Sequence, residues 1–144
     1  MMISTKGRYA LRVMVDLAKH MDDENYISLK AISQRQEISL KYLEAIIGIL
    51  NRAGFVQSLR GVNGGYRLTR DSSQYSVGEI LRLTEGGLTL VNCTSCNNDS
   101  MCSRADNCYT LPVWANLETI INNYLDKVSL YDILNRDYKI DLEK

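Results

Sequence analysis

Apolar side chains recur at spacings of three and four over the first twenty residues of the chain. That period is the signature of an α-helix with one buried face. Ser4 or Thr5 can cap this helix, which is expected to run to about His20. Its apolar stripe consists of Tyr9, Ala10, Val13, Met14, Leu17 and Ala18.

Two further helices follow after a polar connection over residues 21–25 and a short β-prone stretch at 27–29. Ser28 is placed to open the second, which should extend to about Gln36. Ser39 is placed to cap the third, which should stop near Gly54. The third helix turns Leu43, Ile46, Ile47 and Leu50 inward. A short helix, a turn and a longer helix in this order are typical of a helix-turn-helix.

The pattern changes to β-prone stretches at 55–59 and 66–69, with a glycine-rich tip at 60–65 between them. Two such stretches around a glycine-rich tip predict a β-hairpin. Because it follows a helix-turn-helix, this hairpin is interpreted as a wing.

The rest of the chain carries a short helix, a loop and a long helix. Ser76 and Glu79 form a capping-box pattern that opens a helix to about Thr84, and two glycines at 86–87 end it. Pro112 fits the first turn of the long helix, and Ser129 can cap a short terminal one. The stripe of the long helix is Val113, Leu117, Ile120, Ile121, Tyr124, Leu125 and Val128. A detached amphipathic helix needs an apolar partner, and a second copy of the chain can supply it.

These elements predict a mainly α fold with a small β wing. We expect a winged helix-turn-helix head over residues 1–84, a cysteine-rich loop over 85–110, and a dimerisation helix with a short terminal helix over 111–144.

Composition is that of a globular protein, with 45% hydrophobic and 24% charged residues. No apolar run approaches the roughly 20 residues needed to span a bilayer. The first six residues lack the apolar stretch and cleavage site of a signal peptide, so we expect a cytoplasmic protein with no membrane partner. The formal net charge of zero conceals an excess of four positive charges over residues 1–75 and of four negative charges over 76–144. A basic first half suits a polyanion.

All four cysteines fall within one window, at Cys93, Cys96, Cys102 and Cys108, with the spacing Cys-x2-Cys-x5-Cys-x5-Cys. The cytoplasm keeps thiols reduced, so such a cluster favours metal or redox chemistry over structural disulfides. Gathered thiolates can hold a metal ion or an iron–sulfur cluster, or form a redox switch.

Three motifs in order resemble one family: Ile3–Tyr9, Ile38–Glu44 and Arg60–Tyr66. It is the family of winged-helix regulators that includes the iron–sulfur cluster regulator IscR, the nitric-oxide sensor NsrR and the cysteine-metabolism repressor CymR. The resemblance covers essentially the whole chain. It implies a homodimer held by the long C-terminal helices, whose two heads bind a palindromic operator in double-stranded DNA.

The resemblance also implies which residues meet DNA. Ser39, Lys41, Tyr42 and Glu44 lie at the start of the recognition helix, where Glu44 could accept from a cytosine amine and Lys41 and Tyr42 could hold phosphates. Arg60 at the wing tip is placed to enter a minor groove. The Gly64–Gly65 pair would allow close backbone approach to the duplex. Alternatively, Tyr42 packs within the head and Arg60 is merely solvated.

Lys6 and Arg8 could add phosphate contacts near the start of the first helix, although solvated charges there are equally consistent with the sequence.

Matching the cysteines to the cluster-binding members fixes Cys102 and Cys108, whereas the first ligand is Cys93 or Cys96. In the iron–sulfur regulator a histidine three positions before the tryptophan serves as fourth ligand, and here Leu111 occupies that position before Trp114. The spare cysteine could complete an all-thiolate site.

Other side chains fit the fourth position less well. Where some members recruit an acidic residue from the first helix of the opposite subunit, this chain offers Arg8. Asp99 and Asp106 lie inside the loop as weaker candidates. His20 is better explained as a solvated cation at a helix end.

Several interpretations of the loop stay open. A [2Fe–2S] cluster is favoured and a [4Fe–4S] cluster is possible; structural zinc, a thiol/disulfide switch or a docking surface for a protein partner are the alternatives. Cluster assembly, loss or oxidation would reposition the dimer helix and change operator affinity. By resemblance, the regulated genes serve iron–sulfur assembly, cysteine supply or iron homeostasis.

The sequence shows no catalytic arrangement, because the single histidine has no evident nucleophile near it in the sequence.

Overall fold

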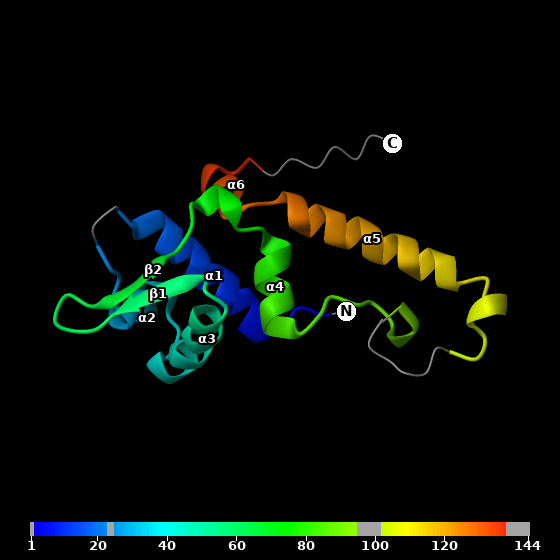
Figure 1. The fold of residues 1–144 in the computed structure, drawn as a ribbon, viewed down its shortest axis with the longest axis horizontal. Helices are drawn as coiled ribbons and strands as arrows, with labels where there is room; N and C mark the ends of the chain where they lie inside the picture. Colours follow the sequence, from blue (N-terminus) through cyan, green and yellow to red (C-terminus); the bar gives the residue numbers. More distant parts are fainter. Residues whose placement is uncertain (1, 23–24, 95–101, 138–144) are drawn as a thin grey trace.

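The computed structural model describes residues 2–22, 25–94 and 102–137 (Figure 1). These residues form a mainly helical structure with one antiparallel strand pair, which confirms the predicted fold class. In chain order the elements are α1 (Thr5–His20), α2 (Leu29–Gln36), α3 (Leu40–Arg52), β1 (Val56–Leu59), β2 (Gly65–Leu68), α4 (Val77–Glu85), α5 (Leu111–Lys127) and α6 (Leu130–Asn135). Short 3-10 turns lie at Ser72–Gln74, Asn92–Thr94 and Ala105–Asn107.

Serine side chains begin most of these helices, as the sequence predicts. A serine hydroxyl can accept from one of the backbone N–H groups that the first helical turn leaves unpaired. The serines that do so are Ser4, Ser28, Ser39, Ser76 and Ser129, so Ser4 and not Thr5 is the cap of α1. Helix starts were therefore predicted closely from local sequence.

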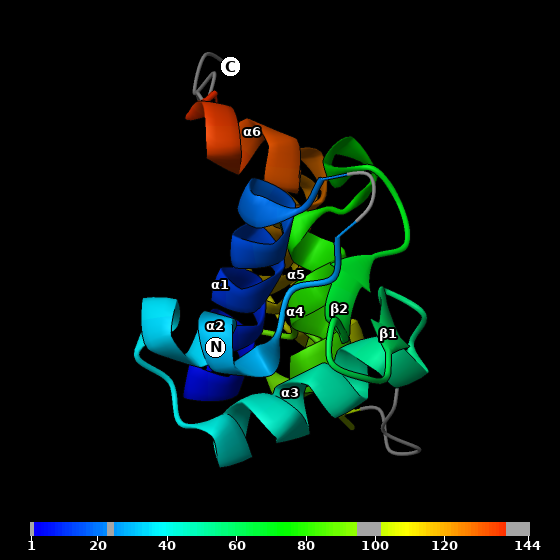
Figure 2. The same ribbon diagram turned by 90° about the vertical axis from the view of Figure 1, so that its left-hand side faces the viewer.

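The main core lies at one end of the molecule, where α1, α2, α3 and the hairpin gather (Figures 1 and 2). Because both α1 and α3 are amphipathic, each turns one apolar face into this core. Its fully buried members include Val13, Met14, Leu17, Leu43, Ile46 and Leu50. The predicted inward faces of the first and third helices are thus confirmed.

The wing is a β-hairpin in which Val56 pairs with Leu68 and Leu59 with Gly65. A third segment joins it, since Ile27 and Tyr66 exchange backbone hydrogen bonds of 2.9 and 2.8 Å. A Cβ on Gly65 would overlap the carbonyl oxygen of Ile27. The close approach at Gly65 is therefore to the chain's own backbone, while approach of the glycine pair to a duplex stays a prediction.

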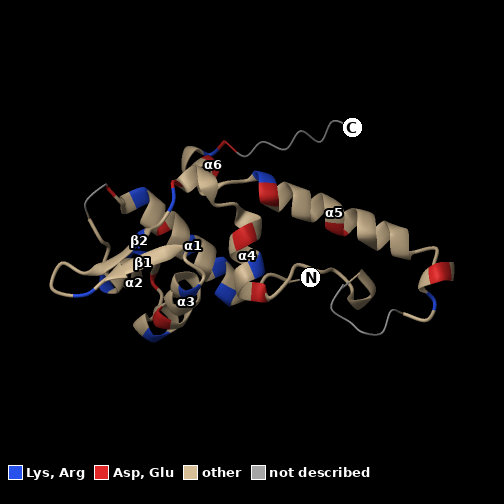
Figure 3. Ribbon diagram, in the orientation of Figure 1, with Lys and Arg blue, Asp and Glu red and all other residues tan. Residues whose placement is uncertain are grey.

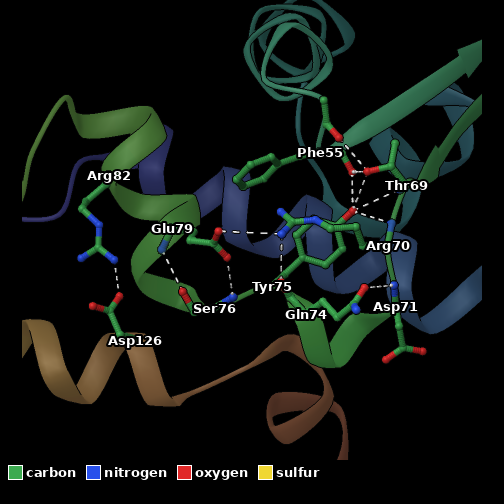
Figure 4. Close-up of polar contacts among 11 residues, drawn as sticks. Phe55, Thr69, Arg70, Asp71, Gln74, Tyr75, Ser76, Glu79, Arg82 and Asp126 are labelled. Atoms are coloured by element: carbon green, nitrogen blue, oxygen red, sulfur yellow. Dashed lines mark hydrogen bonds and ion pairs between the residues drawn. The ribbon is translucent and has the colours of Figure 1, made fainter.

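One buried tyrosine hydroxyl fastens the wing to the start of α4 (Figure 4). The hydroxyl of Tyr75 donates to the carbonyl of Phe55 at 2.7 Å and accepts from the backbone N–H groups of Thr69 at 3.0 Å and Arg70 at 2.9 Å. The Arg70 guanidinium covers the ring face, with its carbon 4.3 Å from the ring centroid. Buried backbone groups need such partners, so this hydroxyl closes the base of the wing.

The same tyrosine stands beside the junction of α5 with the head. Leu130 donates its backbone N–H to the carbonyl of Tyr75 at 3.0 Å, and Val77 donates to the carbonyl of Val128 at 2.8 Å. A second apolar cluster of Val77, Leu81, Leu88 and Val128 packs around this junction. Arg82 of α4 adds hydrogen bonds to Asn122 and Asp126 of α5.

Beyond this junction α5 extends away from the head and has no buried residue (Figure 1). Apolar side chains remain exposed along it, among them Val113 at 57%, Leu117 at 40% and Ile120 at 64%. An exposed apolar stripe of this length on a helix is the mark of an interaction surface. None of the helices in the described residues is long and apolar enough to cross a membrane.

Replacing Tyr75 by Phe should lower the free energy of unfolding by about 1–3 kcal/mol, because the N–H of Arg70 would lose its partner in a partly buried site. Urea unfolding monitored by circular dichroism measures the change. Tyr109→Phe is the matched control, since Tyr109 is 98% exposed and its hydroxyl needs no protein partner. Equal midpoints for the two variants would contradict the assigned role of the Tyr75 hydroxyl.

Candidate nucleic-acid interface and cysteine loop

The first turns of α3 present polar side chains on the face opposite the core. Ser39 accepts from the backbone N–H of Tyr42 at 3.3 Å, which starts the helix. Lys41 and Glu44 are both exposed, while Leu43 between them is fully buried. Because residues three apart share a helix face, Lys41 and Glu44 project together into solvent. This face can present a cation and an acceptor to the edge of a DNA groove.

Tyr42 packs within the head and also stays partly exposed. Its side chain is 37% exposed, yet its ring meets the ring of Tyr9 edge-on, with centroids 5.6 Å apart. Edge-to-face pairs of this kind are favourable. The packing on α1 leaves the side chain partly in solvent.

The basic residues of the wing and of the start of α1 are exposed as predicted. Arg60 and Lys6 both lie at the surface, Arg60 in the turn after β1 and Lys6 in the first turn of α1. Gly61 beside Arg60 has a φ of 116°, a conformation that favours glycine, and the neighbouring Val62 is fully exposed. Arg8 is also exposed and donates to Thr5 at 3.3 Å. Lys and Arg are spread over the head, whereas Leu111–Leu117 of α5 carry no charge (Figure 3).

A buried carboxylate fixes the first helix of the helix-turn-helix. Asp16 of α1 is 2% exposed and accepts two hydrogen bonds from the Arg35 guanidinium, at 3.0 and 2.7 Å, and one from Gln36 at 2.8 Å. Arg12 in turn donates to Gln36 at 3.1 Å. Burial by itself would raise the pKa of Asp16, but the bonds from Arg35 and Gln36 and the positive charge of Arg35 outweigh it, so the pKa lies below its usual value.

This network was missed by sequence reasoning, because Asp16 sits beside the apolar stripe of α1 and its partners lie 19 and 20 residues later in the chain. His20 belongs to the same region. Its ring nitrogen lies 2.8 Å from the carbonyl oxygen of Asp16 at the end of α1, the helix-end position expected of a solvated histidine. His20 is the last residue of α1 and therefore lies in the head.

The cysteine loop runs from α4 to α5. Cys93 and Cys102 are exposed free thiols and Cys108 is half-buried, while Cys96 and Asp99 lie outside the described residues. In the described part of the loop and elsewhere in residues 2–22, 25–94 and 102–137, no three side chains of His, Cys, Asp or Glu converge as metal ligands. The described part of the loop thus presents soft donors that do not converge on one point.

Cys108 is poised for deprotonation at the start of α5. Hydrogen bonds from the Thr110 side chain, 3.4 Å away, and from the backbone of Thr110 and Leu111 lower the pKa of its thiol. Backbone N–H groups at a helix start favour a thiolate for the same reason that they favour any anion. Leu111 is the first residue of α5, and its hydrocarbon side chain offers no ligand atom.

Glu118 ties residues 90–94 to α5. Its carboxylate accepts from the hydroxyl of Thr94 and from the backbone N–H of Leu90 at 3.4 Å. Thr94 directly follows Cys93, so this contact holds Cys93 near the middle of α5. Sequence reasoning did not identify Glu118, because its partners lie 24 and 28 residues away.

Comparison with known proteins gives a consistent result. Residues 3–136 match the Rrf2 family, described as iron-dependent transcriptional regulators. The HTH-type transcriptional regulator IscR of Vibrio cholerae serotype O1 is 37% identical over 134 residues, which cover 93% of this chain and 75% of that protein.

Solved structures give the same picture. The structure of CymR, the global cysteine regulator of B. subtilis, is similar with a TM-score of 0.76 and 33% identity, over 94% of this chain and 98% of that one. The structure of T. potens IscR is similar with a TM-score of 0.74 and 37% identity, over 94% of this chain and 88% of that one.

Replacing Asp16 by Asn should lower the free energy of unfolding by about 1–3 kcal/mol, because Arg35 and Gln36 lose a charged acceptor while Arg35 can still reach water. The depressed pKa also fixes the pH dependence. The stabilisation by Asp16 is fully present above its unfolded value, near 3.8, and is lost as the pH falls through the lower folded value.

Urea midpoints of the wild type and Asp16→Asn, measured from neutral pH down into the acid range, check this expectation. The two curves should converge as the medium becomes acidic. Asp137→Asn serves as a control at an exposed carboxylate. A constant gap between wild type and Asp16→Asn down to the lowest pH would contradict the depressed pKa.

Proposed function

Because the chain belongs to the Rrf2 family of transcriptional regulators, we propose that it is a homodimeric DNA-binding regulator whose cysteine loop holds an iron–sulfur cluster that tunes operator affinity. The family membership makes it a helix-turn-helix regulator and not an enzyme. The observation that carries the finer proposal is the set of free thiols in the segment before α5, which in the described residues are Cys93, Cys102 and Cys108. A cytoplasmic location follows from this function.

Dimerisation is supported by the exposed apolar stripe of α5. Trp114, Leu117 and Ile120 would each leave apolar area in water in a monomer, at a cost of about 25 cal/mol for each Å² that a partner could cover. A second α5 offers the same stripe, and a two-fold pair of identical faces is the commonest way to close such a surface. The uncharged stretch Leu111–Leu117 suits the centre of this interface.

Binding to a palindromic operator follows from that two-fold symmetry. Two copies of α3 would enter successive major grooves about 34 Å apart. Ser39, Lys41 and Glu44 would face base edges and phosphates there, Tyr42 would contact the backbone from the side, and Arg60 would reach an adjacent minor groove. Lys6 would add a phosphate contact from the start of α1.

The donor set fits a cluster. Exposed cysteines without a disulfide supply thiolates, and the lowered pKa of Cys108 favours the ligating form of that side chain. Four cysteine thiolates suffice for a [2Fe–2S] or a [4Fe–4S] cluster, so Cys93, Cys96, Cys102 and Cys108 are the proposed ligands, with [2Fe–2S] favoured. When bound, such a cluster supplies reversible electron transfer and sensitivity to oxidants.

The residues of the chain provide a physical route from the loop to the DNA-binding head. Glu118 joins the loop to α5, and Arg82 joins α5 to α4. Tyr75 then joins the α5–α6 junction to the wing. A change in the loop that shifts α5 would move the junction and the wing together, and small shifts in dimer geometry change how two heads match two half-sites. The regulated genes proposed are those of iron–sulfur assembly, cysteine supply or iron homeostasis.

Protein purified without oxygen should be brown and should contain iron and sulfide in matching amounts. Each of the variants Cys93→Ser, Cys96→Ser, Cys102→Ser and Cys108→Ser should lose most of both, whereas Ser103→Ala in the same loop should retain them. A cluster retained in one of the first two variants would show that the fourth ligand is another side chain. Colourless protein with stoichiometric zinc would make the loop structural, and protein without metal after reconstitution would leave a thiol switch or a protein partner; either result contradicts the cluster.

Replacing Arg60 by Ala should weaken binding to a duplex selected from a random library by the wild-type protein. We expect a loss of about 1–3 kcal/mol in binding free energy, because a side chain in the minor groove gains from its concentrated negative potential. Fluorescence anisotropy titration measures it, with Lys127→Ala on α5 as a control for the loss of one charge. Unchanged affinity in Arg60→Ala would remove the wing from the interface.

A further inference from the structure

Three helices contain a glycine in place of a better helix former: Gly7 in α1, Gly48 in α3 and Gly78 in α4. A glycine inside a helix is unfavourable relative to alanine, because the unfolded chain has more freedom to lose. Each of the three positions therefore calls for a physical reason.

Two of the three glycines are explained within the subunit. A Cβ on Gly7 would overlap the carboxylate of Glu85, which accepts from the hydroxyl of Ser4 at 2.7 Å. A Cβ on Gly78 would overlap the carboxylate of Asp126, which is paired with Arg82. In both places the missing side chain makes room for a polar contact between helices.

Gly48 has no such neighbour. A Cβ at this position would meet one atom within 4 Å, a terminal nitrogen of Arg52 at 3.5 Å, which is an ordinary contact. Arg52 is exposed, and its side chain lies back along α3 over Gly48. Nothing in the described part of the subunit requires a glycine here, and the space in front of Gly48 is open to a partner that approaches α3 from outside.

The position of Gly48 on α3 identifies what approaches. At 3.6 residues per turn, Gly48 and Arg52 lie on the same side of the helix as Lys41 and Glu44, opposite the buried Leu43, Ile46, Ile47 and Leu50. Gly48 is thus near the middle of the face that the proposed function turns toward DNA. Gly48 lies about 10 Å from Lys41 along the axis of α3. This distance is similar to the width of a major groove, so both residues can face the same groove.

We propose that Gly48 is the point at which the backbone of α3 comes closest to the DNA, and that Arg52 beside it holds a phosphate at the rim of the groove. The absent side chain lets the helix lie deeper along the groove wall. The guanidinium, already folded over this bare stretch of helix, then needs only a small rotation to contact the backbone of the duplex. This assignment rests on the proposed DNA binding and adds two residues at the C-terminal half of α3 to it.

The decisive test separates stability from binding. Gly48→Ala should raise the Tm by about 2–5 °C, because alanine is the better helix former and meets no obstacle in the protein. The same variant should bind the library-selected duplex about tenfold more weakly, and Gly48→Leu more weakly still, because the added side chain holds the helix off the groove. Differential scanning calorimetry and fluorescence anisotropy measure the two effects.

Arg52→Ala should weaken binding to all sequences alike and should lower the slope of log affinity against log salt by about one unit, the signature of one lost phosphate contact. Lys127→Ala should leave both affinity and slope unchanged. A more stable Gly48→Ala that binds as tightly as the wild type would overturn the assignment, as would a lower Tm for that variant. A wild-type protein that selects no duplex would instead defeat the proposed DNA binding itself, so the two failures are distinguishable.

Discussion

The phenolic oxygen of Tyr75 is the contact on which the relation between wing and long helix depends. It satisfies two backbone N–H groups and one carbonyl at the base of the wing, and its own carbonyl accepts from Leu130 at the end of the α5 junction. Tyr75 is completely buried, and its hydroxyl serves three backbone groups in a partly buried region, so losing the contact would leave the N–H of Arg70 without this partner. Tyr75 is therefore the residue that contacts both the wing and the junction, and moving one without the other would strain its hydrogen bonds.

The elements predicted from sequence are those whose cause is local. Serine caps and apolar stripes act within a few residues, so the starts of α1, α2, α3, α4 and α6 and their buried faces follow from the chain itself. The contacts that were missed join distant segments. Asp16 meets Arg35 across 19 residues, and Glu118 meets Thr94 across 24. The residues next to a carboxylate in the sequence do not reveal its distant partner. These two contacts therefore could not be predicted without knowing how the helices pack.

The cysteine loop shows the same division in its chemistry. The sequence identifies four cysteine thiols, which are soft donors, within one short window. This was predictable because the type of ligand atom depends only on the residue. The lowered pKa of Cys108 comes from the start of α5, and the place of Cys93 comes from Glu118 on the same helix. The pKa of Cys108 and the position of Cys93 both depend on how the loop contacts α5. The spacing of the cysteines does not give that information. The same holds for the wing, where a side chain at Gly65 is excluded by the backbone of Ile27, which is distant in the sequence.

These constraints together decide how a signal in the loop can reach DNA. A helix of 17 residues is about 25 Å long, and α5 carries the loop at one end and the head junction at the other. Since α5 buries no residue in its own subunit, few contacts within that subunit fix its direction, and a partner covering its apolar face would fix it instead. A change at the loop that altered the packing of two such helices would turn each about its junction, where Tyr75 and Arg82 link it to the wing and to α4. In the proposed dimer, the coupling between the loop and the DNA would for that reason be a property of the pair of subunits more than of either one.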